Sequence, residues 1–147
     1  MTDIQASLGI HQLAKLERFQ KIREQYAQMY NEAFSQMPEI NAPYVVPGSR
    51  HAWHLYIIQL QLELLDIDRA QFIEELKQEN IGTSVHFIPV HLHPYYRDRF
   101  GYKRGDFLNA EYIFDRIITL PLYPRMTPQD AEDVIDAVKR IVERHRK

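Results

Sequence analysis

The first 37 residues carry the pattern that most constrains the fold. Apolar side chains recur there mostly every three or four positions, which is the period of an amphipathic helix with one apolar face. They are Ile4, Leu8, Leu13, Leu16, Phe19, Tyr26, Met29, Tyr30 and Phe34. Thr2 and Gln5 have the spacing of a capping box, Gly9 marks a place for a kink or a join, and the element must end before Pro38.

The pattern predicts a helix of about 25 to 30 residues, where about 11 to 12 residues are usual in a compact domain. Two interpretations stay open. The helix can pack along its whole length inside one domain, or its apolar stripe can extend past its own sheet to another body.

Three short stretches predict strands. Residues 56–62 alternate apolar and polar side chains, residues 82–88 form a short run before Pro89, and residues 117–120 form a third. Residues 38–50 are rich in proline and glycine and predict a loop. Antiparallel pairing is expected for so small a sheet.

Helices are predicted between and after these strands. Asp68 caps one of them, and Asn80 suits the left-handed turn that ends it. Asp106 is expected to cap a helix that runs to Arg116, and Thr127 caps the last one. The sequence therefore predicts an α+β fold, with a small three-stranded, mainly antiparallel sheet covered by helices and a long N-terminal helix, in one domain.

Composition argues against several classes of partner. The formal charge of the 147 residues is −2, with acids and bases mixed, so nucleic acid and anionic membranes are not expected as partners. The chain has no cysteine, which excludes disulfides and thiolate metal sites. No apolar run approaches the roughly 18 residues of a membrane span and no signal peptide opens the chain, so we expect a soluble cytoplasmic protein.

Residues 82–96 predict the functional surface. This stretch holds three of the seven histidines, three aromatic residues and two prolines. Pro89 and Pro94 end the strand, so the imidazoles and tyrosines are expected along an irregular rim, where binding groups are usually carried.

Recognisable catalytic motifs are missing from the chain. There is no GxSxG elbow, no glycine-rich phosphate loop and no HExxH. A three-histidine zinc centre can be imagined from five histidines, but hydrogen-bonding imidazoles on a cleft rim are the better account, and no metal is expected. The five are His51, His54, His86, His91 and His93. The chain therefore lacks the catalytic motifs that a stand-alone enzyme would need.

Four blocks of sequence carry a resemblance to a known family. They are residues 1–9 (MTDIQASLG), residues 51–56 (HAWHLY), residues 81–87 (IGTSVHF) with Pro89, His91, Pro94, Tyr95 and Tyr96, and residues 119–124 (TLPLYP) with Met126 and Thr127. In this order and at this spacing, the blocks resemble the small C-terminal domain of the DegT/DnrJ/EryC1/StrS sugar aminotransferases. The branch that makes 4-amino sugars on nucleotide carriers, including the aminoarabinose and pseudaminic acid pathways, looks most similar.

The resemblance implies that residues 1–147 are one domain of a fold-type I homodimer whose active sites lie at the subunit interface. It implies a large domain ahead of this segment that binds pyridoxal phosphate and supplies the Schiff-base lysine. None of the six lysines matches that motif. We therefore expect Met1 to mark a truncation, the long first helix to pack on the missing domain, and the chain to be inactive alone.

By the same resemblance, the whole enzyme would move an amino group, usually from glutamate, to a keto group on a nucleotide-linked sugar. The small domain would orient the sugar, with His86 and Phe87 bordering its pocket and His91 on the neighbouring loop. From the residues alone, Phe87 can also be core and His91 a surface ring. A self-contained binding or dimerisation module is the alternative for the whole chain.

Overall fold

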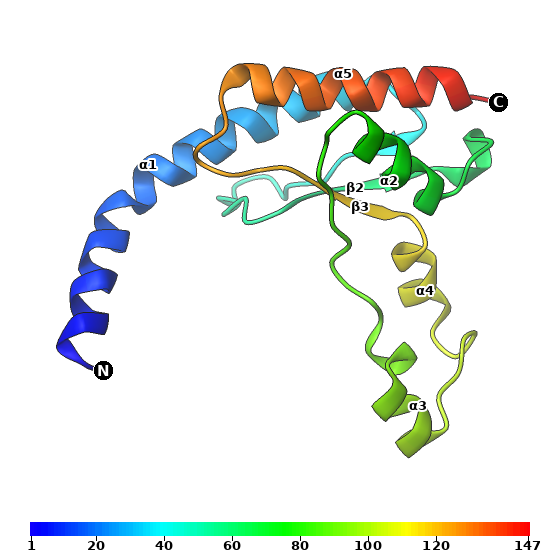
Figure 1. Ribbon diagram of the computed structural model, residues 1–147, viewed down its shortest axis with the longest axis horizontal. Coiled ribbons are helices and arrows are strands. Elements are labelled where there is room, and N and C mark those ends of the chain that lie inside the picture. Colours follow the sequence, from blue (N-terminus) through cyan, green and yellow to red (C-terminus); the bar gives the residue numbers. More distant parts are fainter.

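A three-stranded antiparallel sheet carries the fold in the computed structural model, which describes residues 1–147 (Figure 1). The central strand β2 (Tyr56–Leu60) pairs with β1 (Ile40–Asn41) on one side and with β3 (Ile117–Leu120) on the other. Ile58 and Ile118 lie opposite each other in the register of β2 and β3. Every second side chain of β2 is buried, which confirms the predicted alternation. The α+β class and the antiparallel pairing are therefore confirmed.

The predicted strand at residues 82–88 is wrong. This segment makes one isolated bridge, in which Ser84 and Thr119 exchange two backbone hydrogen bonds of 3.2 and 2.8 Å. Beyond Ser84 the chain leaves the edge of β3, and Pro89 has no N–H with which to continue a ladder.

The third strand is β1, inside the segment 38–50 that was predicted as loop. Ile40 is buried, and the carboxylate of the buried Glu39 forms an ion pair with Arg146 at the other end of the chain. The amide of Gln61 donates to the Glu39 carbonyl oxygen at 2.8 Å. These partners are distant in sequence, so the local pattern could not show the strand.

The long first helix is confirmed. Helix α1 (Asp3–Phe34) has 32 residues, begins with the capping box of Thr2 and Gln5, and runs through Gly9 without a break. Its buried residues begin at Gln20, so only the C-terminal half packs on the domain.

Two further helices also match their predicted starts. Asp68 forms a capping box for α2 (Arg69–Gln78), and Thr127 forms one for α5 (Pro128–His145). Asn80 has a φ of 61°, the left-handed conformation expected after α2.

One hydrophobic cluster joins the C-terminal half of α1, the sheet, α2 and α5. The turn η1 (Leu62–Leu64) leads from β2 towards α2. In the core, the hydroxyl groups of Tyr30 and Tyr56 donate to the Pro121 carbonyl oxygen (2.8 Å) and to the Asn31 side chain (2.7 Å). The buried tyrosines are thereby satisfied.

A lobe formed by residues 86–115 projects from the sheet (Figure 1). It contains the turn η2 (Val90–Leu92) and the short helices α3 (Pro94–Phe100) and α4 (Leu108–Phe114), where an irregular rim and one longer helix were predicted. Asp106 does not cap α4, because its carboxylate accepts a hydrogen bond of 2.9 Å from the amide of Lys103 and closes a turn instead.

The lobe buries polar side chains and exposes aromatic ones, which is the opposite of an ordinary protein core. His91 and Glu111 are its two buried residues, while its phenylalanine and tyrosine side chains other than the half-buried Phe114 are exposed. The exposed aromatic residues are Phe87, Tyr95, Tyr96, Phe100, Tyr102, Phe107 and Tyr112. The lobe therefore has a polar centre and an aromatic surface.

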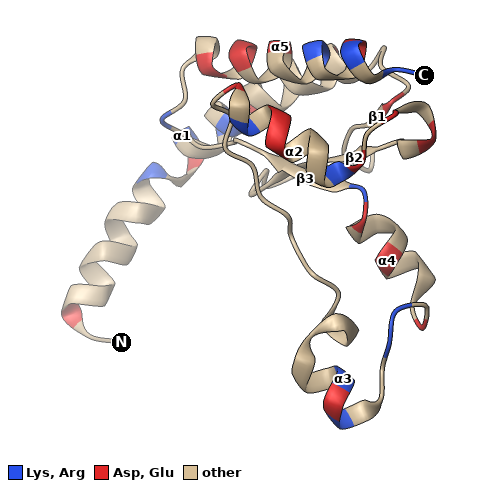
Figure 2. Ribbon diagram, turned by 45° about the vertical axis from the view of Figure 1, so that its right-hand side comes forward, with Lys and Arg blue, Asp and Glu red and all other residues tan.

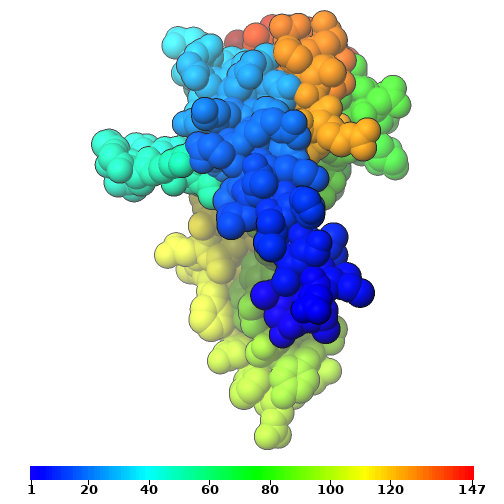
Figure 3. Space-filling model, turned by 90° about the vertical axis from the view of Figure 1, so that its left-hand side faces the viewer, coloured from blue at the N-terminus to red at the C-terminus, as the bar shows by residue number.

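The N-terminal half of α1 is exposed as well. Its apolar residues are between 54% and 75% exposed; they are Ile4, Leu8, Ile10, Leu13 and Leu16. No Asp, Glu, Lys or Arg lies between Asp3 and Lys15, and Figure 2 shows this half almost free of charge. In Figure 3 it extends away from the body of the domain, on the same side as the lobe. Within this chain, the apolar stripe therefore extends past its own sheet. No helix has the length and apolar character to cross a membrane.

Candidate functional site

His86 and Phe87 lie where the lobe leaves the sheet. Nδ1 of His86 is 2.8 Å from the hydroxyl oxygen of the buried Thr119 on β3, which fixes the ring, while Nε2 makes no hydrogen bond within the chain. The ring of Phe87 meets the His86 ring edge-on, with 4.6 Å between centroids, and Phe87 is 73% exposed. Phe87 is therefore not a core residue of this chain. The pair offers one polar and one apolar contact side by side.

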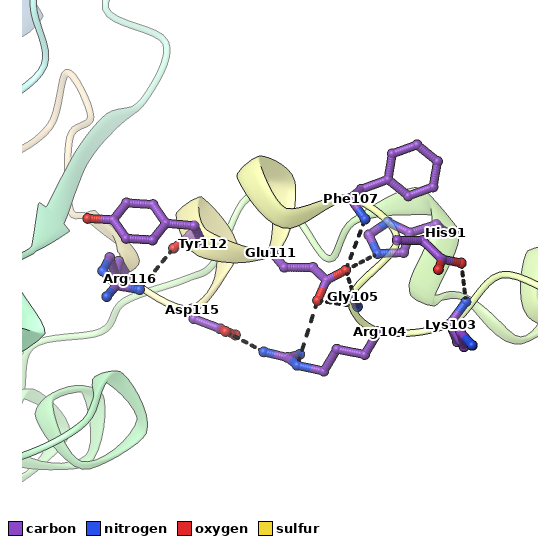
Figure 4. A network of polar contacts seen from close by, with 10 residues as sticks. His91, Lys103, Arg104, Gly105, Phe107, Glu111, Tyr112, Asp115 and Arg116 are labelled. Carbon is purple, nitrogen blue, oxygen red and sulfur yellow. Dashed lines mark hydrogen bonds and ion pairs between the residues drawn. The ribbon is translucent and has the colours of Figure 1, made fainter.

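His91 is held inside the lobe by a carboxylate. Its Nε2 atom lies 2.9 Å from Oε1 of Glu111, and Glu111 also accepts hydrogen bonds from the amides of Gly105 and Phe107 at 2.8 and 3.3 Å (Figure 4). The alternative of a surface ring is wrong for His91, since it is 6% exposed.

Glu111 is ionised in this setting. Burial on its own would raise the pKa of Glu111, but the hydrogen bonds from Gly105, His91 and Phe107 outweigh it and lower the pKa below its ordinary value. An ionised carboxylate only accepts hydrogen bonds, so Nε2 of His91 carries the proton and donates it. Arg104 adds a positive charge, with its Nε 3.9 Å from Glu111 and a second ion pair to Asp115.

A cavity of about 450 Å³ opens beside His91, within the usual size range of small-molecule sites. Its walls include four aromatic rings in a continuous series with His91; they are Tyr96, Phe100, Tyr102 and Phe107. Neighbouring ring centroids in this series are 6.0, 5.9, 5.5 and 4.7 Å apart. The cavity is therefore mostly apolar, with one imidazole at its wall.

The structure thus brings together His86, Phe87 and Thr119 at one place and His91 and Glu111 at another. Sequence reasoning did not find Thr119 and Glu111. Glu111 lies 20 residues from its histidine, and no short motif connects them. The zinc hypothesis finds no support, because no three His, Asp or Glu side chains gather where they could hold a metal ion.

The six lysines of the chain lie at its surface. A Schiff-base lysine is activated in an enclosed site. Five of the six are exposed and Lys139 is half-buried. Lys77 pairs with Glu74 at 3.3 Å, and Lys147 donates to the carbonyl oxygen of Leu62 at 3.3 Å.

Comparison with known proteins defines the class. The fold matches that of Spr1654 from Streptococcus pneumoniae, solved in its PLP form, with a TM-score of 0.88 and 28% identity over 98% of this chain and 36% of that one. The model of the DegT/DnrJ/EryC1/StrS aminotransferase family matches residues 1–139. The chain belongs to that family of sugar aminotransferases, which confirms the resemblance seen in the sequence.

Two relatives show how much of a family member this chain represents. Protein MJ1066 of Methanocaldococcus jannaschii is 56% identical over 146 residues, which are 99% of this chain and 38% of the relative. The spore coat polysaccharide biosynthesis protein SpsC of Bacillus subtilis is 52% identical over 143 residues, 97% of this chain and 37% of the relative. The chain therefore spans less than two fifths of the length of these relatives.

Proposed function

We propose that residues 1–147 are the C-terminal small domain of an aminotransferase that passes an amino group from glutamate to a keto group on a nucleotide-linked sugar. The exposed apolar half of α1 is the observation that carries this proposal. A continuous exposed apolar surface of this kind normally marks a contact with another protein body, so this half of α1 requires a cover. The relatives are long enough to supply one.

The cofactor in this proposal is pyridoxal phosphate, bound by a large domain that precedes this segment. It would act as the electron sink of the amino transfer. The surface positions of the six lysines support a Schiff-base lysine outside this chain. The chain alone would be inactive. We call the small domain joined to its cofactor domain the assembled enzyme, and propose that it is a cytoplasmic homodimer that acts in amino-sugar or cell-surface polysaccharide biosynthesis.

The small domain would hold the sugar. In this proposal His86, fixed by Thr119, presents Nε2 to a sugar hydroxyl group, and the exposed ring of Phe87 forms an apolar wall beside it. His91 would contribute from within the lobe. Such contacts act by orientation, since they hold the reacting carbon at the chemistry supplied by the other domain.

Two measurements test the proposal. Sequencing upstream of the Met1 codon is expected to reveal, in frame, a domain with a Schiff-base lysine; a stop codon there would favour a self-contained binding or dimerisation module. The purified chain is expected to show no visible absorbance from bound pyridoxal phosphate and no transamination, while the assembled enzyme shows both. A cofactor band near one equivalent in the chain alone would contradict the proposal.

A further inference from the structure

We propose that the aromatic cavity of the lobe binds a nucleobase and selects bases that carry a ring N–H. Nδ1 of His91 would accept that N–H, and Glu111 would be the positioning residue that fixes the imidazole. This inference rests on the proposed function, because it assigns a place to the base of the nucleotide-linked sugar.

The walls of the cavity suit a flat ring. Tyr96, Phe100 and Tyr102 present successive rings with small interplanar angles of 23° and 28°, and Phe107 stands nearly perpendicular to Tyr102 at 79°. Aromatic side chains bind bases by stacking, which tolerates any base because every base has a π-face. The aromatic rings therefore supply affinity without choosing among bases.

The choice comes from His91. Its Nε2 proton is committed to Glu111, and its Nδ1 makes no hydrogen bond within the chain. His91 is 6% exposed, and it forms part of the cavity wall. A buried ring with one fixed nitrogen and one nitrogen without a partner in the chain, at a cavity wall, is a preorganised polar contact.

The surroundings of Glu111 decide the chemistry of Nδ1. The amides of Gly105 and Phe107 and the side chain of Arg104 hold the Glu111 carboxylate in place, and the carboxylate in turn holds the His91 proton on Nε2. In a neutral imidazole with the proton on Nε2, Nδ1 is an acceptor. Uracil and thymine offer it N3–H and guanine N1–H, whereas cytosine and adenine present a lone pair at the equivalent ring nitrogen.

Base selection is tested by NMR titration of the 147-residue chain with UDP, N3-methyl-UDP and CDP. UDP is expected to shift the resonances of His91 and Phe107. N3-methyl-UDP and CDP should bind about tenfold more weakly, as expected for the loss of one hydrogen bond. Equal binding of UDP and N3-methyl-UDP, shifts confined to other surfaces, or no binding of UDP would each overturn the proposal.

Variants separate the stacking role from the positioning role. Phe107→Ala should weaken the binding of all three nucleotides, while Tyr44→Ala, at an exposed position outside the lobe and the cavity, should leave it unchanged. Glu111→Leu, which removes the acceptor of the Nε2 proton, should reduce the preference for UDP over N3-methyl-UDP and leave the affinity for N3-methyl-UDP unaltered. If Glu111→Leu keeps the full preference, Glu111 does not position His91.

The assembled enzyme distinguishes this inference from the proposed function. Transamination of sugars carried equally well on UDP and on N3-methyl-UDP would overturn the base site and leave the aminotransferase role standing. Selective binding of UDP without any transamination would support the base site and contradict the aminotransferase role.

Discussion

At the scale of single residues, two polar pairs do most to define the site. Thr119 fixes His86 at the root of the lobe, and Glu111 fixes His91 inside it. In each pair the partner of the histidine, Thr119 or Glu111, holds the imidazole ring in a defined orientation. Each pair makes a prediction that does not depend on the other.

Replacing His86 tests the first pair. In the assembled enzyme, His86→Ala is expected to lower kcat/KM for the nucleotide-linked sugar by about 5- to 150-fold, the effect of losing about 1 to 3 kcal/mol. Thr119→Val, which keeps the side-chain shape and removes the hydroxyl group, should have a smaller effect in the same direction. His54→Ala is the control, because His54 is exposed and makes no side-chain hydrogen bond. Unchanged kinetics in His86→Ala would contradict this role.

Acid titration tests the second pair. The pKa of Glu111 is lowered from its ordinary value of 4.5 by its hydrogen bonds in the folded chain. The stabilisation that this carboxylate gives the lobe is therefore complete above pH 4.5 and lost as the pH falls through the lower, folded-state value.

The amide resonance of Gly105, which donates to Glu111, should report this transition by NMR. Glu111→Gln should abolish the transition, whereas Glu143→Gln, at an exposed position on α5, should leave it in place. A Gly105 titration that persists in Glu111→Gln would show that another group is responsible.

At the scale of elements, the capping boxes make a comparison between two helices possible. Thr127 caps α5, whose buried face is central to the core, while Thr2 caps the exposed end of α1. Thr127→Ala is expected to reduce the free energy of unfolding by about 1 kcal/mol. Thr2→Ala should change it far less, because the packed part of α1 begins only at Gln20. Equal losses in denaturant titrations would mean that α1 unfolds as one unit with the core.

The elements also show what the sequence could and could not reveal. Helices α1, α2 and α5 and strand β3 were predictable because caps and apolar periods lie within a few residues of one another. Strand β1 is defined by the pairing of Ile40 with Leu60 on β2, and the polar centre of the lobe by the contact between His91 and Glu111. Contacts between such distant positions leave no local period or motif, so β1 and Glu111 were missed.

At the scale of the whole molecule, two exposed surfaces set this chain apart from a self-sufficient domain. They are the N-terminal half of α1 and the aromatic surface of the lobe, which extend on the same side of the sheet (Figure 1). Apolar surface on this scale marks an interaction site in a monomeric protein. We therefore expect the N-terminal half of α1 to be covered in the assembled enzyme.

A charged residue in the N-terminal half of α1 tests this expectation. Leu8→Glu should change the stability of the isolated chain by less than about 0.5 kcal/mol, because Leu8 is 61% exposed there. In the assembled enzyme the same change would bury an unpaired charge and prevent stable assembly, as seen by size-exclusion chromatography. Gln25→Glu, at an exposed position in the packed half of α1, should be tolerated in both.

Hydrogen exchange of the amides of residues 3–16 tests the central claim most directly. In the chain alone these amides should exchange rapidly, because that half of α1 has no packing partner. In the assembled enzyme they should be among the slowly exchanging amides. Equally rapid exchange in both would contradict the claim that this domain is completed by a cofactor domain on α1.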